Sequence, residues 1–229
     1  MALTDVLAVV RSSPEAVAAH DKQRWMSLFA ESYVIEDPVG SRPVRGEAIS
    51  DFWDCFIEHN DIAFEVHHDW VDGLQVVRDV TIHTTLATGI TVHTPAHLRY
   101  TLDEDLKITH MAAHWEPAPV FAQLMRPNPK HVRSMVTMNA RMFDKLGLGG
   151  TARFVGAVRS VGRMGKDAVA VQLGDKVEDI HKVIAAGDTV SLTCTVEGGP
   201  AAVIATLDRS TRTFRDCRMY TQLADRVTD

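Results

Sequence analysis

The segment YVIEDPVGSRP at residues 33–43 decides how the first half of the chain folds. Its apolar start predicts a short strand over 33–37, and Pro38 ends that strand because proline cannot donate to a strand ladder. The remainder is rich in turn residues and predicts a loop. Apolar residues recur at helical spacing on both sides of the segment, over 3–31 and 46–58. One strand between helices is therefore predicted.

The apolar period changes from helical to alternating after Asn60. Alternation with period two is typical of half-buried strands, and turn residues such as Asp-Gly separate the alternating runs. Helices followed by a run of antiparallel strands are typical of α+β proteins rather than of parallel α/β proteins. Strands are predicted at residues 62–71, 74–86, 90–102 and 107–116.

The second half of the chain repeats this order of elements. Helical spacing returns over 131–146 and again after Gly165, and four alternating runs follow. Four prolines between the halves predict an extended linker, because proline fixes φ and removes a donor, and a short helix at 120–125 is the alternative left open within it. We therefore predict a first domain at 1–118, a Pro-rich linker at 119–130, and a degenerate second copy of the same fold at 131–229. The alternative is one domain followed by an unrelated tail.

The composition is that of an ordinary globular protein, with 45% apolar and 24% charged residues. A net charge of −6 argues against nucleic acid as a partner, which needs a basic face. No run approaches the roughly 20 apolar residues of a membrane span, and the start of the chain has no basic signal-peptide region, so no membrane partner is predicted. Three widely spaced cysteines form no C-x-x-C motif and favour reduced thiols in the cytoplasm.

Five segments of the first half carry a family resemblance. They are Leu28-Phe29-Ala30-Glu31, Val34 to Ser41, Gly46 to Ile49, His97-Leu98-Arg99-Tyr100 and Met111 to Trp115. Over residues 5–116 the chain resembles the ketosteroid-isomerase and SnoaL-like branch of the nuclear-transport-factor-2-like superfamily. The resemblance implies a curved sheet wrapped around helices, which forms a cone with an apolar pocket. Members commonly dimerise through the convex sheet face, so the second copy would complete an intramolecular pseudo-dimer, and a homodimer is a further option.

The resemblance also assigns a catalytic residue, since the Asp before the proline is the base of ketosteroid isomerases. Here that residue is Asp37, and burial among aromatic side chains would raise its pKa toward the range of a working base. The alternative is that Asp37 caps the turn that follows it. The family's oxyanion donors, a Tyr and a protonated Asp, fall near Ser13 and Ala96, which cannot replace them. The predicted pocket wall consists of Trp25, Phe29, Phe52, Phe56, Tyr100 and Trp115.

His83 is predicted as a second catalytic residue, a proton donor that faces Asp37. A register set by Gly89 would place Thr81, His83 and Thr85 on the concave face, with Val80, Ile82 and Leu86 on a convex face covered by the second domain. An imidazole beside a carboxylate can exchange a proton near pH 7. The alternative is an exposed His83 on a solvated face. His97, His110 and His114 are predicted together on the convex face, as polar packing rather than as a metal site.

The predicted function is that of a cofactor-free acid/base enzyme. Isomerase and dehydratase-type lyase chemistry lead, with cyclase and epoxide hydrolase chemistry left open. The partner would be a small apolar steroid- or polyketide-like compound, and neither a cofactor nor a metal is expected. The alternative is a non-catalytic module of the same fold that binds an apolar ligand.

Overall fold

The computed structural model describes residues 3–125, 127–156 and 159–224. In the first half, three helices and one strand precede a four-stranded meander. The elements are α1 (Leu3–Ala18), α2 (Lys22–Ser27), β1 (Phe29–Glu36), α3 (Ala48–Phe56), β2 (Asn60–Asp72), β3 (Gln75–Leu86), β4 (Thr91–Leu102) and β5 (Ile108–His114). The predicted helices, strand and meander are thereby confirmed.

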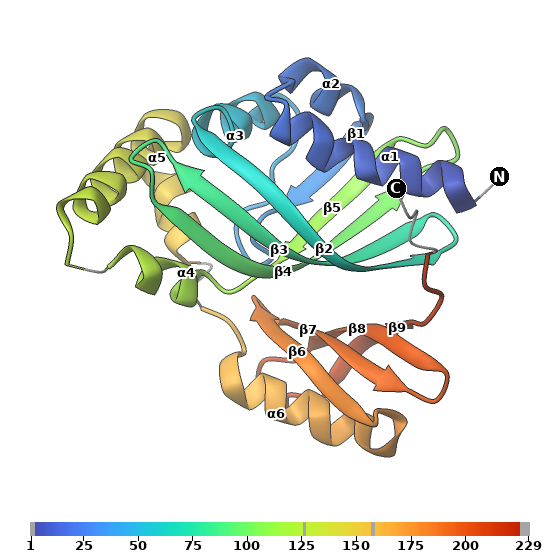
Figure 1. The fold of residues 1–229 in the computed structure, drawn as a ribbon. Helices are drawn as coiled ribbons and strands as arrows, with labels where there is room; N and C mark the ends of the chain where they lie inside the picture. The colour runs from blue at the N-terminus through green and yellow to red at the C-terminus, as the bar shows by residue number, and fades with distance from the viewer. Residues whose placement is uncertain (1–2, 126, 157–158, 225–229) are drawn as a thin grey trace.

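The first sheet has the order β1-β5-β4-β3-β2, and β1 runs parallel to β5 whereas the other neighbours are antiparallel. The sheet curves around α1, α2 and α3, which lie over its concave face (Figure 1). Apolar residues of α1 at helical spacing, among them Val6, Val10 and Val17, are buried there beside Trp25 and Trp53. The α+β class and the curved sheet around helices are confirmed.

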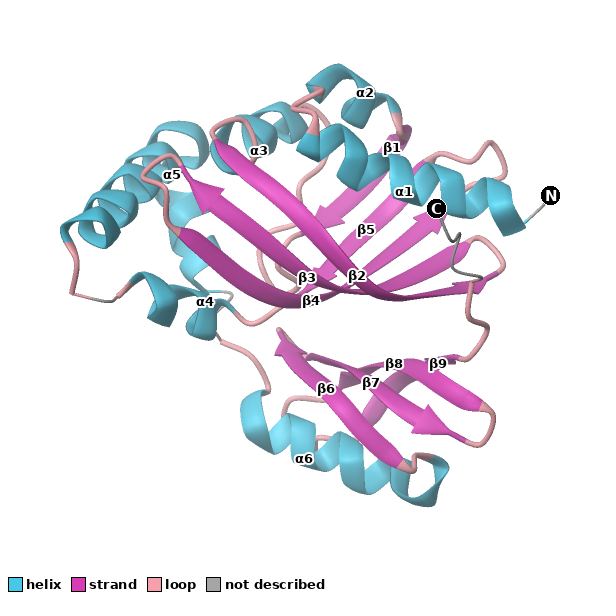
Figure 2. Cartoon of the chain, in the orientation of Figure 1, coloured by secondary structure: helices cyan, strands magenta, loops and turns pink. Residues whose placement is uncertain are grey.

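The second half contains three helices, one short 3-10 helix and four strands. The elements are α4 (Pro117–Leu124), α5 (Pro129–Gly156), α6 (Gly162–Leu173), η1 (Gly174–Lys176), β6 (Asp179–Ala186), β7 (Thr189–Val196), β8 (Gly199–Leu207) and β9 (Phe214–Tyr220). The strands form an antiparallel sheet in the order β6-β7-β8-β9, and α6 covers the face turned away from the first sheet (Figure 2). The order α6-β6-β7-β8-β9 parallels α3-β2-β3-β4-β5. The division into a first domain and a degenerate second copy stays a prediction.

The predicted extended linker at 119–130 is wrong, because most of this segment is helical. Pro117 lies in the first turn of α4, and Pro129 begins α5. Proline is tolerated in the first turn of a helix, where its missing N–H would have no intrahelical partner. The prolines therefore begin helices here rather than prevent them.

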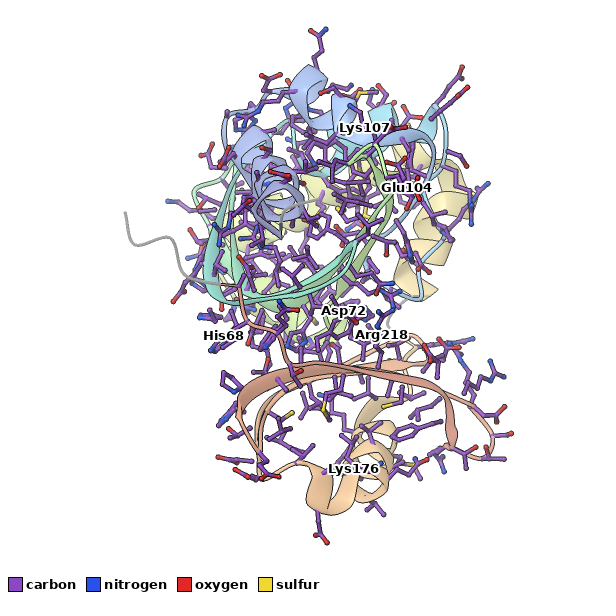
Figure 3. The ribbon with its side chains drawn as sticks, turned by 90° about the vertical axis from the view of Figure 1, so that its right-hand side faces the viewer. His68, Asp72, Glu104, Lys107, Lys176 and Arg218 are labelled. Atoms are coloured by element: carbon purple, nitrogen blue, oxygen red, sulfur yellow. The ribbon has the colours of Figure 1, made fainter. Side chains whose placement is uncertain are left out.

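The second sheet packs on the convex face of the first sheet (Figures 1 and 2). Part of the contact is apolar and consists of Trp70, Val77, Ala202, Ile204 and Tyr220. The rest is polar. Both ring nitrogens of His97 lie 2.8 Å from hydroxyl oxygens, those of Ser191 and Thr193, and Asp79 pairs with Lys182. At one edge of the interface Arg218 donates a 2.6 Å bond to Asp72 (Figure 3).

The turn after β1 also touches the second sheet, through the side chain of Val39 against Ala186 and through a close backbone contact. Gly40 adopts φ +93° and lies against Gly187, so that a Cβ added at Gly40 would come within 2.6 Å of the Gly187 Cα. Only glycine combines this left-handed conformation with so close an approach. The contact ties the loop that follows Asp37 to the second sheet.

Candidate functional site

A cavity of about 190 Å³ lies between the concave face of the first sheet and its helices. Its wall is mostly apolar, with Ile62 and Phe64 from β2, Leu98 from β4 and Met111 from β5. The helical hairpin formed by α4 and α5 adds Val120, Phe121, Leu124 and Met138 to the wall. For comparison, an apolar cavity of roughly 150 Å³ accommodates benzene. The cavity therefore has room for a small ring compound.

Asp37 is the one acidic side chain on the described cavity wall. It follows the last residue of β1, and its neighbour Glu36 points to the outer side, where it accepts a 2.8 Å bond from His110. The indole Nε1 of Trp115 donates a 2.6 Å hydrogen bond to Oδ1 of Asp37. Burial raises the pKa of Asp37 to about 6, and the bond from Trp115 partly opposes that rise. A carboxyl group in this range can both accept and return a proton near neutral pH.

The predicted partner of Asp37 is in the wrong place, because His83 lies on the convex side of β3. Its Nε2 is 3.1 Å from Oε2 of Glu65, and its Nδ1 is 2.7 Å from Nδ1 of His93. The residues of β3 that line the cavity are instead the even-numbered ones, Ile82, Thr84 and Leu86. The predicted register of β3 was inverted, and Asp37 and His83 cannot act on one ligand.

Tyr100 is the phenol on the cavity wall, in β4, where its backbone pairs with Met111 of β5. Burial raises its pKa, and the guanidinium of Arg78 and the Ser13 hydroxyl act in the opposite direction. The negative charge of Asp37 also raises the pKa of Tyr100, which places the two groups within electrostatic range of one another. The sequence predicted Tyr100 as part of the pocket wall, and the structure places it there.

Most of the predicted wall is found where it was expected. Trp25, Phe52, Phe56 and Trp115 line the cavity together with Tyr100. Phe29 does not, since it packs edge-on against Trp25 with ring centroids 4.9 Å apart, outside the cavity wall. Phe29 is the first residue of β1, eight positions before Asp37 along the chain, and its side chain is buried in the core.

The two positions assigned to the missing oxyanion donors differ in their surroundings. Ser13 lines the cavity, and its Oγ accepts a 3.1 Å bond from Nε1 of Trp25. Ala96 is buried in the core without lining the cavity. The serine hydroxyl can donate to Tyr100 while it accepts from Trp25. Ser13 thus hydrogen-bonds to Tyr100, and it does not take over the role of the family's oxyanion-donor Tyr.

Sequence reasoning missed the polar residues Asn60, Thr84 and Thr94 and the whole α4–α5 contribution to the wall. The apolar residues Val120, Phe121 and Leu124 inside the Pro-rich segment were the signal that could have indicated a covering helix. Within the described part of the chain, no three His, Cys, Asp or Glu side chains are grouped to hold a metal ion. Nor does any described helix have the length and apolarity needed to cross a membrane.

The comparisons with known proteins agree with this geometry. Residues 10–111 match the family model described as a SnoaL-like domain. The predicted resemblance of residues 5–116 to the ketosteroid-isomerase and SnoaL-like branch is thereby confirmed. The matched residues include Asp37, Tyr100 and most of the cavity wall. A search of the curated proteins gave no match to this chain.

Several solved structures are similar to about half of the chain. Ketosteroid isomerase from Mycobacterium sp. is 23% identical, covers 50% of this chain and 95% of its own, and gives a TM-score of 0.48. RV0760c from Mycobacterium tuberculosis, solved with estradiol-17beta-hemisuccinate, is 25% identical over 49% of this chain and 94% of its own, with a TM-score of 0.47. The epoxide hydrolase/cyclase-like enzyme SalBIII is 22% identical over 51% and 94%, with a TM-score of 0.47.

Proposed function

We propose that this protein is a cofactor-free enzyme that moves a proton on a small apolar carbonyl compound, with Asp37 as the base. The observation that carries the proposal is the carboxyl group of Asp37, buried on an apolar cavity wall with a pKa of about 6. A solvated carboxylate would be too weak a base at neutral pH, whereas a carboxylate with a pKa of about 6 has the strength that proton removal near neutral pH needs. The match of residues 10–111 to a SnoaL-like domain supports the same reading.

In the proposed step Asp37 removes a proton from the carbon beside the carbonyl group. The electron pair of that C–H bond forms the double bond of an enolate, and the carbonyl oxygen takes the negative charge. The phenol of Tyr100 stabilises that oxygen by donating a hydrogen bond, in the role first assigned to His83. Where the substrate carries a β,γ double bond, the enolate extends over it as a dienolate, and the proton on Asp37 returns to the γ carbon, which gives the conjugated isomer. Loss of a hydroxyl group from the enolate, with that proton, gives a dehydrated product and water.

Trp115 serves the same step as a positioning residue. Its hydrogen bond fixes one oxygen of Asp37 and leaves Oδ2 as the atom that takes the proton. The bond also favours the carboxylate form, so that the base is ionised above about pH 6 despite its burial.

The test is exchange of deuterium from heavy water into cyclic ketones of one to four rings, followed by NMR. The wild-type chain is expected to label the carbon beside the carbonyl in at least one ketone. Asp37→Asn should slow labelling about 10²–10⁴-fold, the usual effect of losing a general base. Glu36→Gln is the matched control, since Glu36 is the adjacent carboxylate and faces the other way. Equal rates in the wild type and in Asp37→Asn would refute the proposal.

The alternative is a module that binds an apolar ligand without turnover. Ser13 and Ala96 favour it, because they stand where the family resemblance expects strong oxyanion donors. Under this alternative, Asp37 and Tyr100 orient the polar end of the ligand by hydrogen bonds. A ketone that binds in the cavity, and is labelled no faster than in buffer, would establish the binding module instead of the enzyme.

A further inference from the structure

Helix α5 has an inner face that completes the cavity. Its straight part ends at Gly147, where φ is +66°. Met138 lines the cavity, and Met142 is buried against Cys55 in a cluster that also includes Trp115. The inner face of α5 is thus fully occupied by the cone.

The opposite side of the same helix is also apolar, and it is uncovered. Val132, Val136 and Phe143 are 60%, 63% and 48% exposed, and they are spaced four and seven residues apart, which places them on one side of a helix. We call these three residues the outer α5 face. Met125, between α4 and α5, is 71% exposed and extends the apolar surface toward α4. Figure 1 shows α5 at the side of the cone, away from the second sheet.

The surroundings of the outer α5 face are basic although the chain as a whole is acidic. Residues 129–146 contain four Lys or Arg residues and one Asp, whereas the whole chain has a net charge of −6. Lys145 pairs with Asp54 and Arg141 lines a second cavity beside Cys55, so Lys130 and Arg133 are the basic residues left for the outer side. Lys130 and Arg133 are exposed in the first turns of α5, close to Val132 along the chain. A helix that combines an exposed apolar row with flanking basic residues has the pattern of helices that lie in a membrane interface.

We infer that the outer α5 face docks on an anionic lipid surface. A second copy of the chain suits it less well, since two α5 helices would bring like charges together. Three side chains in a row are also fewer than the 20–30 residues that each partner of a stable dimer contributes. A surface of anionic lipids matches both the apolar row and the Lys and Arg residues beside it.

Docking in this orientation would set the α4–α5 side of the cavity wall toward the lipid. The helix that carries the outer α5 face also forms, on its inner face, part of the cavity wall. An apolar ligand dissolves in the bilayer, so it could enter between α4 and α5 without crossing water. The sequence prediction of no membrane partner considered spanning segments only, and a helix lying on the surface needs none.

The test is flotation of the full chain with vesicles of phosphatidylcholine, with or without phosphatidylglycerol. The wild type should float only with the anionic vesicles, and less so at high salt. Replacing Lys130 and Arg133 by Gln should lower the partition coefficient roughly 30-fold, since each basic residue near an anionic surface contributes about a factor of five. Val132→Ser, Val136→Ser and Phe143→Ser combined should lower it about tenfold or more.

The matched control is a double variant of α6, Met164→Ser with Val171→Ser. These residues are 59% and 80% exposed, and α6 covers the second sheet on the far side of the molecule. This control should float as the wild type does. Asp37→Asn should float as well, so failure of the enzymatic proposal would leave this result intact.

Three outcomes would overturn the inference. The wild type could fail to float with anionic vesicles, or the α6 control could lose flotation as much as the α5 variant. The wild type could also sediment as a dimer that the triple α5 variant converts to a monomer, which would assign the outer α5 face to a second copy. Thermal unfolding of the α5 and α6 variants, expected to be unchanged because their positions are exposed, verifies that the fold is kept.

Discussion

The indole nitrogen of Trp115 lies 2.6 Å from a carboxyl oxygen of Asp37, to which it donates a hydrogen bond. Two opposing effects act on the pKa of this acid. Burial raises the pKa of Asp37, and the indole lowers it, with a result of about 6. The pair joins the end of β1 to the segment after β5, two neighbouring strands that run parallel. Burial therefore sets the strength of the proposed base, and a contact between residues 78 positions apart moderates it.

Trp115→Phe should raise the pKa of Asp37 above 6, because it removes the one donor while keeping an aromatic wall. A hydrogen bond to a charged group is worth about 1.5–3 kcal/mol, which corresponds to a rise of about one to two pH units. The carboxyl carbon of Asp37, followed by NMR as a function of pH, reports this value without any substrate. The pH–rate profile should move by the same amount, with the rate recovered at high pH. An unchanged pKa would mean that the indole does not tune the base.

Asp37→Asn should stabilise the protein at pH 7. The folded-state pKa of about 6 is above the ordinary 3.8, so the native state favours the protonated form and stability falls as pH rises from 3.8 to 6. Above pH 6 the cost is constant at about 3 kcal/mol as an upper value. Urea unfolding should show a gain of about 1–3 kcal/mol for Asp37→Asn at pH 7 and little gain at pH 3.5. A destabilised variant at pH 7 would contradict the burial of this charge.

Acid should weaken the interface between the two sheets through His97. Burial lowers the pKa of this imidazole to about 4, against an ordinary 6.5, so the unfolded state takes up the proton first. Stability is then full above pH 6.5 and falls as pH drops toward 4, by about 3 kcal/mol. The slope of unfolding free energy against pH should flatten in His97→Gln. His83→Gln, a substitution at a surface imidazole, should keep the wild-type slope.

Gly40→Ala should destabilise the chain more than Gly89→Ala does. Both glycines have positive φ, at +93° and +79°, so both alanine variants carry backbone strain of about 1–2 kcal/mol. Only at Gly40 would the added Cβ also meet backbone, at 2.6 Å from Gly187, whereas Gly89 has open space around it. The difference between the two losses in urea unfolding measures the contact between the loop and the second sheet. Equal losses would show that the contact is not tight.

The sequence predicted the fold well where local pattern and packing agree. The helices, the strands and the direction in which the side chains of β4 and β5 point follow from periodicity. Periodicity placed Leu98 and Met111 on the cavity side and His97 on the convex side. Asp37 was found because the residues on either side of it carry the family resemblance. These features depend on neighbours in the chain, and the sequence contains them.

The errors concern contacts between distant parts of the chain. The register of β3 was inverted because it was set from Gly89 alone, which placed apolar residues toward the second sheet, whereas that interface contains Asp79, His97 and Lys182. A buried polar interface is stable only when its partners match, and those partners lie more than 90 residues away. The cover that α4 and α5 place over the cavity is equally non-local. Neither the register of β3 nor the cover over the cavity can be predicted from one segment of the sequence.

The role of Asp37 is the central claim, and its most direct test is the rate of deuterium exchange into a cavity-bound ketone as a function of pH. For the wild type the rate should rise with pH and level off above an inflection at about 6, where Asp37 loses its proton. In Asp37→Asn the rate should fall about 10²–10⁴-fold and the inflection should vanish. An Asp37→Asn variant that keeps both the rate and the inflection would contradict the account.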